Sequence, residues 1–170
     1  MRLNNLLGAG LSFGLILLAA GCSPHAAAGG SAVPAVSGAA AAAIHPVSGL
    51  AVIPLSITAS GKVHRFRVEI ARSDAEQEKG LMFRTAMGAD EGMIFPMQPP
   101  RRAAFWMRNT VIPLDIIFIG SDHRILDIAA NAVPYDETPL PSAGAAAGVL
   151  ELNGGRAAAL GIGPGDRVDW

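Results

Sequence analysis

Residues 53–70 read IPLSITASGKVHRFRVEI, and this stretch decides the fold class. The first six residues favour a strand, Ala59-Ser60-Gly61 supplies a turn, and residues 64–70 alternate between apolar and charged side chains. Successive side chains of a strand point to opposite faces. The segment therefore predicts a hairpin with His64, Phe66, Val68 and Ile70 on one face and Arg65, Arg67 and Glu69 on a solvent-exposed face.

The chain continues to its C-terminus in the same manner, as short apolar segments cut by Gly, Pro, Asn and Asp at intervals of about ten residues. We expect further strands at residues 92–95, 103–107, 114–119, 124–129 and 149–152, and a closing strand within residues 161–168. This spacing predicts a mainly β domain over residues 50–170. We expect a small, single-domain β barrel or sandwich with one or two short helices.

One helix and two loops are predicted between these strands. Ser73-Asp74-Ala75-Glu76 is a capping box, and Gly80 is suited to end the helix that it opens. Proline cannot donate a hydrogen bond to a sheet, so the prolines at positions 96, 99 and 100 predict a loop between two strands. Residues 135–144, with two prolines and a glycine, predict a second long loop.

The N-terminal residues predict export rather than structure. Arg2 precedes an apolar stretch over residues 6–18 and three small residues, which together predict a secretory signal peptide over residues 1–21. The run Leu18-Ala19-Ala20-Gly21-Cys22 resembles the lipobox of bacterial lipoproteins, and the resemblance implies a lipid on Cys22. Ser23 in place of Asp then implies the outer membrane. The alternative is an ordinary cleavage site and a soluble periplasmic protein.

A linker follows, because residues 26–43 contain only Ala, Gly, Ser, Val and Pro. We therefore expect residues 22–49 to tether the domain flexibly. The remaining chain is nearly balanced in charge: beyond residue 61 it carries 12 Lys and Arg and 14 Asp and Glu, a net charge of −2. Binding to nucleic acid uses a large basic field, so we expect no nucleic acid partner.

Five runs in the folded part carry a family resemblance. They are EQEKGLMFR at 76–84, EGMIF at 91–95, FWMRNTVIPLD at 105–115, VLELNGG at 149–155 and GIGPGD at 161–166. In order and spacing, residues 62–169 resemble the bacterial family known as domain of unknown function 192. The resemblance implies a compact, mostly β domain that is often secreted and has no settled biochemical activity. Arg108 stands where that family often has Lys.

Residues 106–115 are the most promising candidate site. Trp106, Arg108, Asn109 and Asp115 set an indole, a cation, an amide and a carboxylate around one bend between two apolar strands. Such a group can bind a polar ligand, with Trp106 stacking on a ring and the others fixing oxygens or hydroxyls. Structural roles compete with this interpretation. Trp106 can belong to the core, and Asp115 can pair with Arg84 or Arg108.

Glu151 joins this candidate site if its face of the strand is an open cleft. Asp115 and Glu151 would then be candidates for a carboxylate pair that catalyses hydrolysis by general acid–base chemistry. A structural acid or a solvent-facing charge is the alternative for each. We name no catalytic residue on the sequence alone.

Other chemistry is poorly supported. The single cysteine lies at position 22, and His64 and His123 are not in ligand spacing, so we expect neither a metal site nor a cofactor. Met82, Met87, Met93, Met97 and Met107 can bind copper or line a groove, but core packing is the simpler role.

Our leading hypothesis is a lipid-anchored, non-enzymatic module that binds a polar envelope ligand such as a saccharide or a cell-wall fragment. Its candidate ligand-binding residues are Trp106, Arg108, Asn109, Asp115 and Glu151. Two alternatives stay open: a carboxylate-dependent hydrolase, and an interaction or assembly factor whose Met-rich and Pro-rich loops dock another envelope protein.

Overall fold

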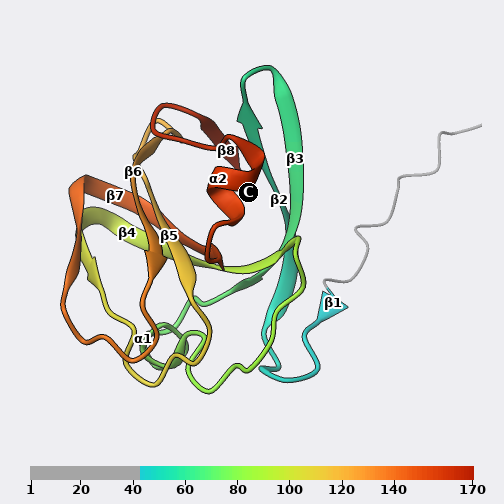
Figure 1. Cartoon of the computed structure of the whole chain (residues 1–170), viewed down its shortest axis with the longest axis vertical. Coiled ribbons are helices and arrows are strands. Elements are labelled where there is room, and N and C mark those ends of the chain that lie inside the picture. Colours follow the sequence, from blue (N-terminus) through green and yellow to red (C-terminus); the bar gives the residue numbers. More distant parts are fainter. Residues whose placement is uncertain (1–42) are drawn as a thin grey trace, which may run out of the picture. The chain divides into compact units, whose positions relative to one another are not determined.

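The computed structural model describes residues 43–170 (Figure 1). The predicted signal peptide, Cys22 and most of the predicted linker lie outside these residues. The described part begins with β1 (Ala43–Ile44), which pairs with the start of β2 (Ala51–Ala59). His45 closes the intervening turn, accepting from Gly49 N at 2.9 Å and donating to Leu50 O at 2.8 Å through its backbone. The folded region therefore starts before residue 50.

The predicted hairpin is confirmed. β2 pairs with β3 (Lys62–Ile70) in antiparallel register from Val52 opposite Glu69 to Ala59 opposite Lys62. Ser60 and Gly61 form the turn with φ values of 48° and 76°, the left-handed backbone that two-residue hairpins require. The expected alternation holds along most of β3, but Glu69 is buried rather than solvent-exposed.

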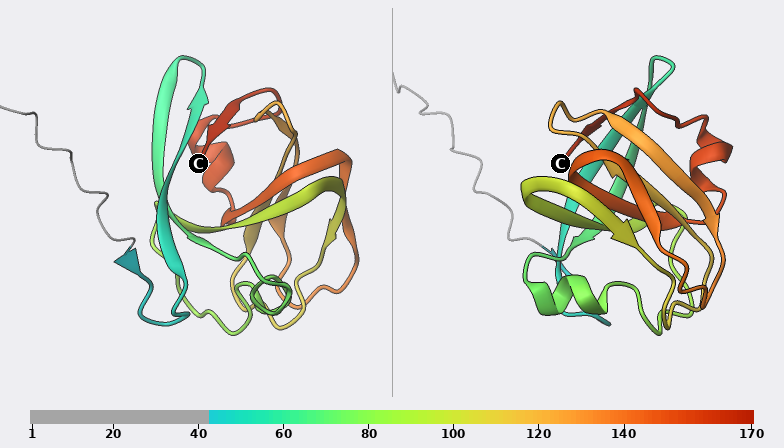
Figure 2. Two further views of the ribbon diagram at one scale, coloured as in Figure 1. Left: turned by 180° about the vertical axis from the view of Figure 1, so that it is seen from behind. Right: turned by 90° about the vertical axis from the view of Figure 1, so that its left-hand side faces the viewer.

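The other strands are β4 (Glu91–Phe105), β5 (Leu114–Ile119), β6 (Ile125–Ala132), β7 (Leu140–Asn153) and β8 (Arg167–Asp169). Their order in the sheet is β1-β2-β3-β4-β7-β5-β6, and β8 pairs with β2. The sheet curls into a half-barrel, as the views in Figure 1 and Figure 2 show. The mainly β fold with two short helices agrees with the predicted fold class.

The loop predicted around the prolines is wrong, because β4 runs through it as one long strand. Pro96 lies opposite Gly148 and Arg101 lies opposite Ala146, so the register shifts between them. Pro99 and Pro100 lie in this irregular segment, where no ladder hydrogen bond from them is needed. The second predicted loop is also shorter than expected, since β7 already begins at Leu140.

Both helices are short. α1 (Asp74–Lys79) has the predicted capping box: Ser73 Oγ accepts from Glu76 N at 3.3 Å, and Glu76 Oε2 accepts from Ser73 N at 2.8 Å. α2 (Arg156–Leu160) follows β7 and has no side-chain cap. Neither helix of residues 43–170 is long and apolar enough to cross a membrane.

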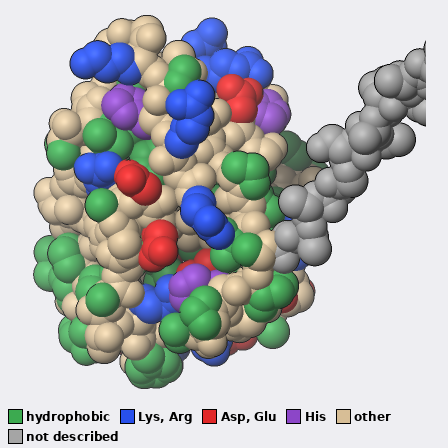
Figure 3. All heavy atoms as spheres, turned by 90° about the vertical axis from the view of Figure 1, so that its right-hand side faces the viewer, with side chains coloured by type: hydrophobic (Ala, Val, Ile, Leu, Met, Phe, Trp, Pro, Cys, Tyr) green, Lys and Arg blue, Asp and Glu red, His purple; other side chains and the backbone are tan. Residues whose placement is uncertain are grey.

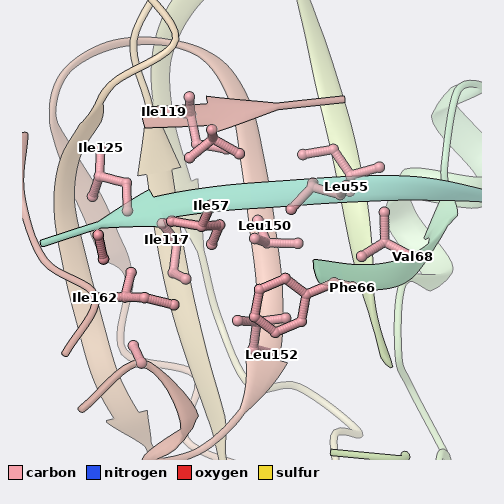
Figure 4. Close-up of a cluster of buried hydrophobic side chains, with 14 of the residues drawn as sticks. Leu55, Ile57, Phe66, Val68, Ile117, Ile119, Ile125, Leu150, Leu152 and Ile162 are labelled. Atoms are coloured by element: carbon pink, nitrogen blue, oxygen red, sulfur yellow. The ribbon is translucent and has the colours of Figure 1, made fainter. Parts of the chain in front are cut away.

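Two hydrophobic clusters cover the two faces of the sheet, and β5 is buried on both faces. Figure 4 shows the first cluster, in which side chains of β5 and β7 meet those of the β2–β3 hairpin and Ile162. The second cluster contains Met93, Met97 and Met107 together with Phe95 and Phe118. These three methionines are core residues, as the simpler interpretation of the sequence predicts.

The surface carries charges of both signs close together. Figure 3 shows one face of the domain, on which basic, acidic and histidine side chains are interspersed and hydrophobic side chains gather toward one end. No field of a single sign dominates that face.

Candidate functional site

A cavity of about 300 Å³ opens on the side of the second hydrophobic cluster. It is lined by the end of α1 with the turn that follows it, by β4, and by residues 106–110. Glu151 of β7 lines it as well. Phe95 and Phe105 stack edge to face with ring centroids 5.1 Å apart, which gives the β4 wall a rigid aromatic part.

Glu151 is the most unusual residue of this cavity. It is only 5% exposed, and it lies between Met93 of β4 and Ile116 of β5, both fully buried. Its carboxyl group forms no hydrogen bond or ion pair within residues 43–170. Burial therefore raises the pKa of Glu151 to about 8. A carboxyl group with this pKa is mostly protonated at neutral pH, so it can donate a hydrogen bond as well as accept one.

Glu69 provides a contrast within the same row of the sheet. Met93 lies opposite both Glu69 of β3 and Glu151 of β7, so the two acids share a face. The Glu69 carboxylate receives two hydrogen bonds from Arg84, at 2.8 and 3.1 Å, and His45 Nε2 lies 3.6 Å from it. The Glu69 carboxylate is thus paired with side chains of the same domain, whereas the Glu151 carboxyl group has no such partner within residues 43–170 and lines the cavity.

Trp106 and Arg108 stand at the mouth of the cavity. Between them, Met107 is fully buried and anchors the loop. Its backbone N–H donates to Asp136 O at 2.8 Å, and its carbonyl accepts from Tyr135 N at 3.1 Å. The anchor leaves Trp106 49% exposed, and the Arg108 Cζ atom lies 5.9 Å from the Trp106 ring centroid. The indole is therefore accessible to a ligand, with a cation beside it.

Asn109 does not line this cavity but lies next to it. It lines an adjoining hollow of about 370 Å³ that also contains Trp106 and Arg108. Its φ is 53°, a left-handed conformation that Asn tolerates better than most residues. Its carbonyl accepts from Phe83 N at 2.8 Å, and its Nδ2 lies 3.7 Å from the Met82 sulfur. Asn109 therefore shapes the loop and borders the site.

Asp115 does not line the cavity with the other candidate residues. It lies opposite Leu152, whereas Glu151 lies opposite Ile116, so the two carboxylates are on opposite faces of the sheet. Asp115 is fully buried and accepts from the backbone N–H groups of Asn131, Gly155 and Ala157 at 2.9, 2.9 and 2.8 Å. Our expectation that Asp115 contacts the ligand is corrected, and so is the alternative in which it forms a carboxylate pair with Glu151: its oxygens are occupied by backbone N–H groups of β6 and of the start of α2.

Several cavity residues were missed by the sequence reasoning. Lys79 at the end of α1 and Arg101 and Arg102 on β4 line the cavity, and so does Glu78. None of these three cations, nor Arg108, forms an ion pair with a carboxylate in the described part of the chain. A weak signal was present, since Arg101-Arg102 interrupts an otherwise uncharged stretch from Gly92 to Met107.

Among residues 43–170, no three His, Cys, Asp or Glu side chains converge where an ion could bind. The groups available to a ligand are an exposed indole, four cations, one exposed carboxylate and one buried, uncharged acid.

Comparison with known families and structures gives relatives but no activity. A family model, DUF192, described as an uncharacterized ACR, matches residues 55–170. No match is found among curated proteins.

Two solved structures are similar to this chain over most of their length. A protein of unknown function from Novosphingobium aromaticivorans DSM 12444 is 65% identical, with a TM-score of 0.75, covering 78% of this chain and 94% of that one. A putative transcription regulator from Sinorhizobium meliloti 1021 is 40% identical, with a TM-score of 0.69, covering 71% of this chain and 94% of that one.

Proposed function

Because the chain belongs to the DUF192 family, whose description assigns no activity, we propose from the geometry of the cavity that the domain is a binding module for a polar ligand. The ligand class we propose is a saccharide or a cell-wall fragment. One observation carries the proposal: Glu151, which is far from Trp106 and Arg108 in the sequence, lines the same cavity of about 300 Å³ as they do. An exposed aromatic ring beside convergent polar groups suits a sugar ring.

The proposal is tested by thermal unfolding against a panel of saccharides and cell-wall fragments. A ligand at about 100 times its dissociation constant adds about 2.7 kcal/mol to stability. For a domain of this size, the midpoint should rise by roughly 10 °C. The variant Trp106→Ala should keep the unliganded midpoint, since Trp106 is half-exposed, and should lose the rise. A rise of the same size in Trp106→Ala would reject the cavity as the binding site.

We further propose that the protein is exported with its signal peptide and held in the outer membrane, facing the periplasm, by a lipid on Cys22. The support is the lipobox-like run ending at Cys22, which lies outside the described residues. Mass spectrometry of the N-terminal peptide tests it, because a diacylated or triacylated Cys22 is expected. An unmodified peptide would favour a soluble periplasmic protein.

A hydrolase is the second candidate, and it is favoured by the raised pKa of Glu151. A protonated acid at neutral pH can act as a general acid. Because Asp115 faces the other side of the sheet, Glu78 is the second carboxylate that lines the same cavity. This candidate requires turnover of a glycoside substrate that both Glu78→Gln and Glu151→Gln abolish. Binding without turnover would favour the binding module.

Two other partner classes have weaker support. The hypothesis that methionine-rich loops dock an envelope protein is weakened, because Met93, Met97 and Met107 are buried and cannot contact a partner. The name of one structural relative, a putative transcription regulator, would suggest DNA. The net charge of −2 beyond residue 61 favours a small ligand instead.

A further inference from the structure

The charges around the cavity are strongly asymmetric. Lys79, Arg101, Arg102 and Arg108 line it, whereas Glu78 is its one exposed acid. The second acid, Glu151, is 5% exposed, has only apolar neighbours beside it in the sheet, and forms no hydrogen bond within residues 43–170. Four cations that have no ion-pair partner among residues 43–170 therefore line the same cavity as a buried carboxyl group that forms no hydrogen bond there.

From this arrangement we infer that the ligand is an acidic sugar, bearing a carboxylate or a phosphate, and that Glu151 recognises this anion as a hydrogen-bond donor. The inference rests on the proposed function and specifies its ligand. A protonated carboxyl group donates one O–H, and a bond from O–H to an anionic oxygen is among the stronger hydrogen bonds in proteins. The cations at the mouth offset the charge that the ligand carries into the cavity.

This recognition makes affinity depend on pH. If Glu151 loses its proton, it loses the donor and places a second negative charge against the anion. The pKa of Glu151, raised by burial to about 8, sets where this happens. The charged groups that face the cavity from α1, β4 and the 106–110 loop are Glu78, Lys79, Arg101, Arg102 and Arg108. On β3, Glu69 shares the face of Glu151 but is held by Arg84 and His45.

The test compares three sugars that differ at one group. N-acetylglucosamine is neutral, N-acetylmuramic acid adds a carboxylate, and N-acetylglucosamine 1-phosphate adds a phosphate. Isothermal titration of each into the purified full-length chain should give an affinity at least about tenfold higher for one or both acidic sugars at pH 7. Their affinity should fall about tenfold at pH 9, where about one Glu151 in ten remains protonated.

Two variants separate Glu151 from the rest of the site. Glu151→Gln keeps a donor that does not ionise, so it should bind the acidic sugars at pH 7 and show no loss at pH 9. The double variant Arg101→Gln/Arg102→Gln changes only exposed side chains and should reduce the preference for acidic over neutral sugar about tenfold. It tests the inference even if Glu151→Gln does not fold.

The outcomes distinguish the inference from the function on which it rests. Equal affinity for neutral and acidic sugars, or a loss at pH 9 that persists in Glu151→Gln, would overturn the inference and leave a polar-ligand module standing. Absence of binding by all three sugars, together with a flat response to other saccharides and cell-wall fragments, would overturn both.

Discussion

Glu69, Asp115 and Glu151 are all buried, yet their carboxyl groups meet three different environments. Glu69 has an arginine, Asp115 has three backbone N–H groups, and Glu151 has none of these within the described residues. Burial of an ionised carboxyl group is costly unless partners offset it. The first two acids therefore have their partners within the fold, and the third is available for a ligand.

The environment of Glu151 predicts a pH-dependent stability. Between its ordinary pKa of 4.5 and the raised value of about 8, the unfolded chain releases a proton that the folded chain retains. The contribution of Glu151 is thus fully present below about pH 4.5 and is lost as the pH rises through 8. Glu151→Gln should therefore gain several kcal/mol relative to the wild-type chain on going from pH 5 to pH 9, measured by urea unfolding. A difference between the two proteins that stays constant with pH would contradict this.

Asp115 predicts the opposite kind of effect, a loss of stability on substitution. Asp115→Ala leaves three buried backbone N–H groups without their acceptor, so the free energy of unfolding should fall by about 3 to 5 kcal/mol. Asp127→Ala is the matched control. It removes one exposed hydrogen bond, from Ala143 N at 3.1 Å, and should cost less than about 1 kcal/mol. Similar losses in the two variants would show that the buried acceptor is not what stabilises this region.

These residues also show how much of the candidate site can be predicted from a single sequence. Trp106, Arg108 and Glu151 were predicted because their chemistry is conspicuous in an apolar context, and the structure brings them together. Asp115 has equally conspicuous chemistry, but its role depends on backbone N–H groups of β6 at Asn131 and of the turn at Gly155, which no local pattern connects to it. Glu69 lies on the predicted face of β3, but it is buried rather than exposed, because alternation does not reveal that Arg84 donates hydrogen bonds to it.

At the scale of elements, short-range signals predict well and long strands do not. The β2–β3 hairpin and the α1 capping box depend on residues within a few positions of each other, and both are confirmed. Two short strands were predicted in place of β4, because proline usually ends a strand. Here the register shifts between Pro96 and Arg101, so the N–H groups that the prolines lack are not needed for pairing. Whether a proline disrupts a strand depends on the hydrogen bonds that the partner strand requires at that position, and the local sequence does not specify that partner.

Gly92 predicts how sensitive the β4–β7 pairing is beside Glu151. A Cβ atom at this position would contact the carbonyl oxygen of Glu151 and would lie 2.8 Å from the Leu152 Cδ2 atom. Gly92→Ala should therefore lower the free energy of unfolding by about 1 to 3 kcal/mol. Gly163→Ala, where no other part of the described structure lies within 4 Å, should change it by less than about 0.5 kcal/mol. Chemical denaturation of both variants checks this, and a neutral Gly92→Ala would contradict the close packing.

The whole molecule explains why the cavity itself could not be predicted. β7 lies between β4 and β5 in the sheet, so Glu151 of β7 has both strands as neighbours. β4 ends just before Trp106, and β5 begins just before Asp115. β3 and β4 are parallel neighbours, with α1 between them in the chain. Such long-range pairings leave no periodic signal in the residues that form them. The mainly β class was predictable from strand and turn spacing, and the order of the strands was not.

The central claim is that a sugar-like ligand enters the cavity beside Trp106, and intrinsic fluorescence tests it most directly. The chain has two tryptophans, and Trp170 packs against His123 with ring centroids 4.9 Å apart. In a Trp170→Phe variant of the full-length chain, Trp106 is the one remaining indole. Titration with N-acetylmuramic acid and related cell-wall fragments should then produce a saturable change in emission. Emission that stays constant across the panel, while calorimetry reports binding, would place the ligand elsewhere and contradict the account.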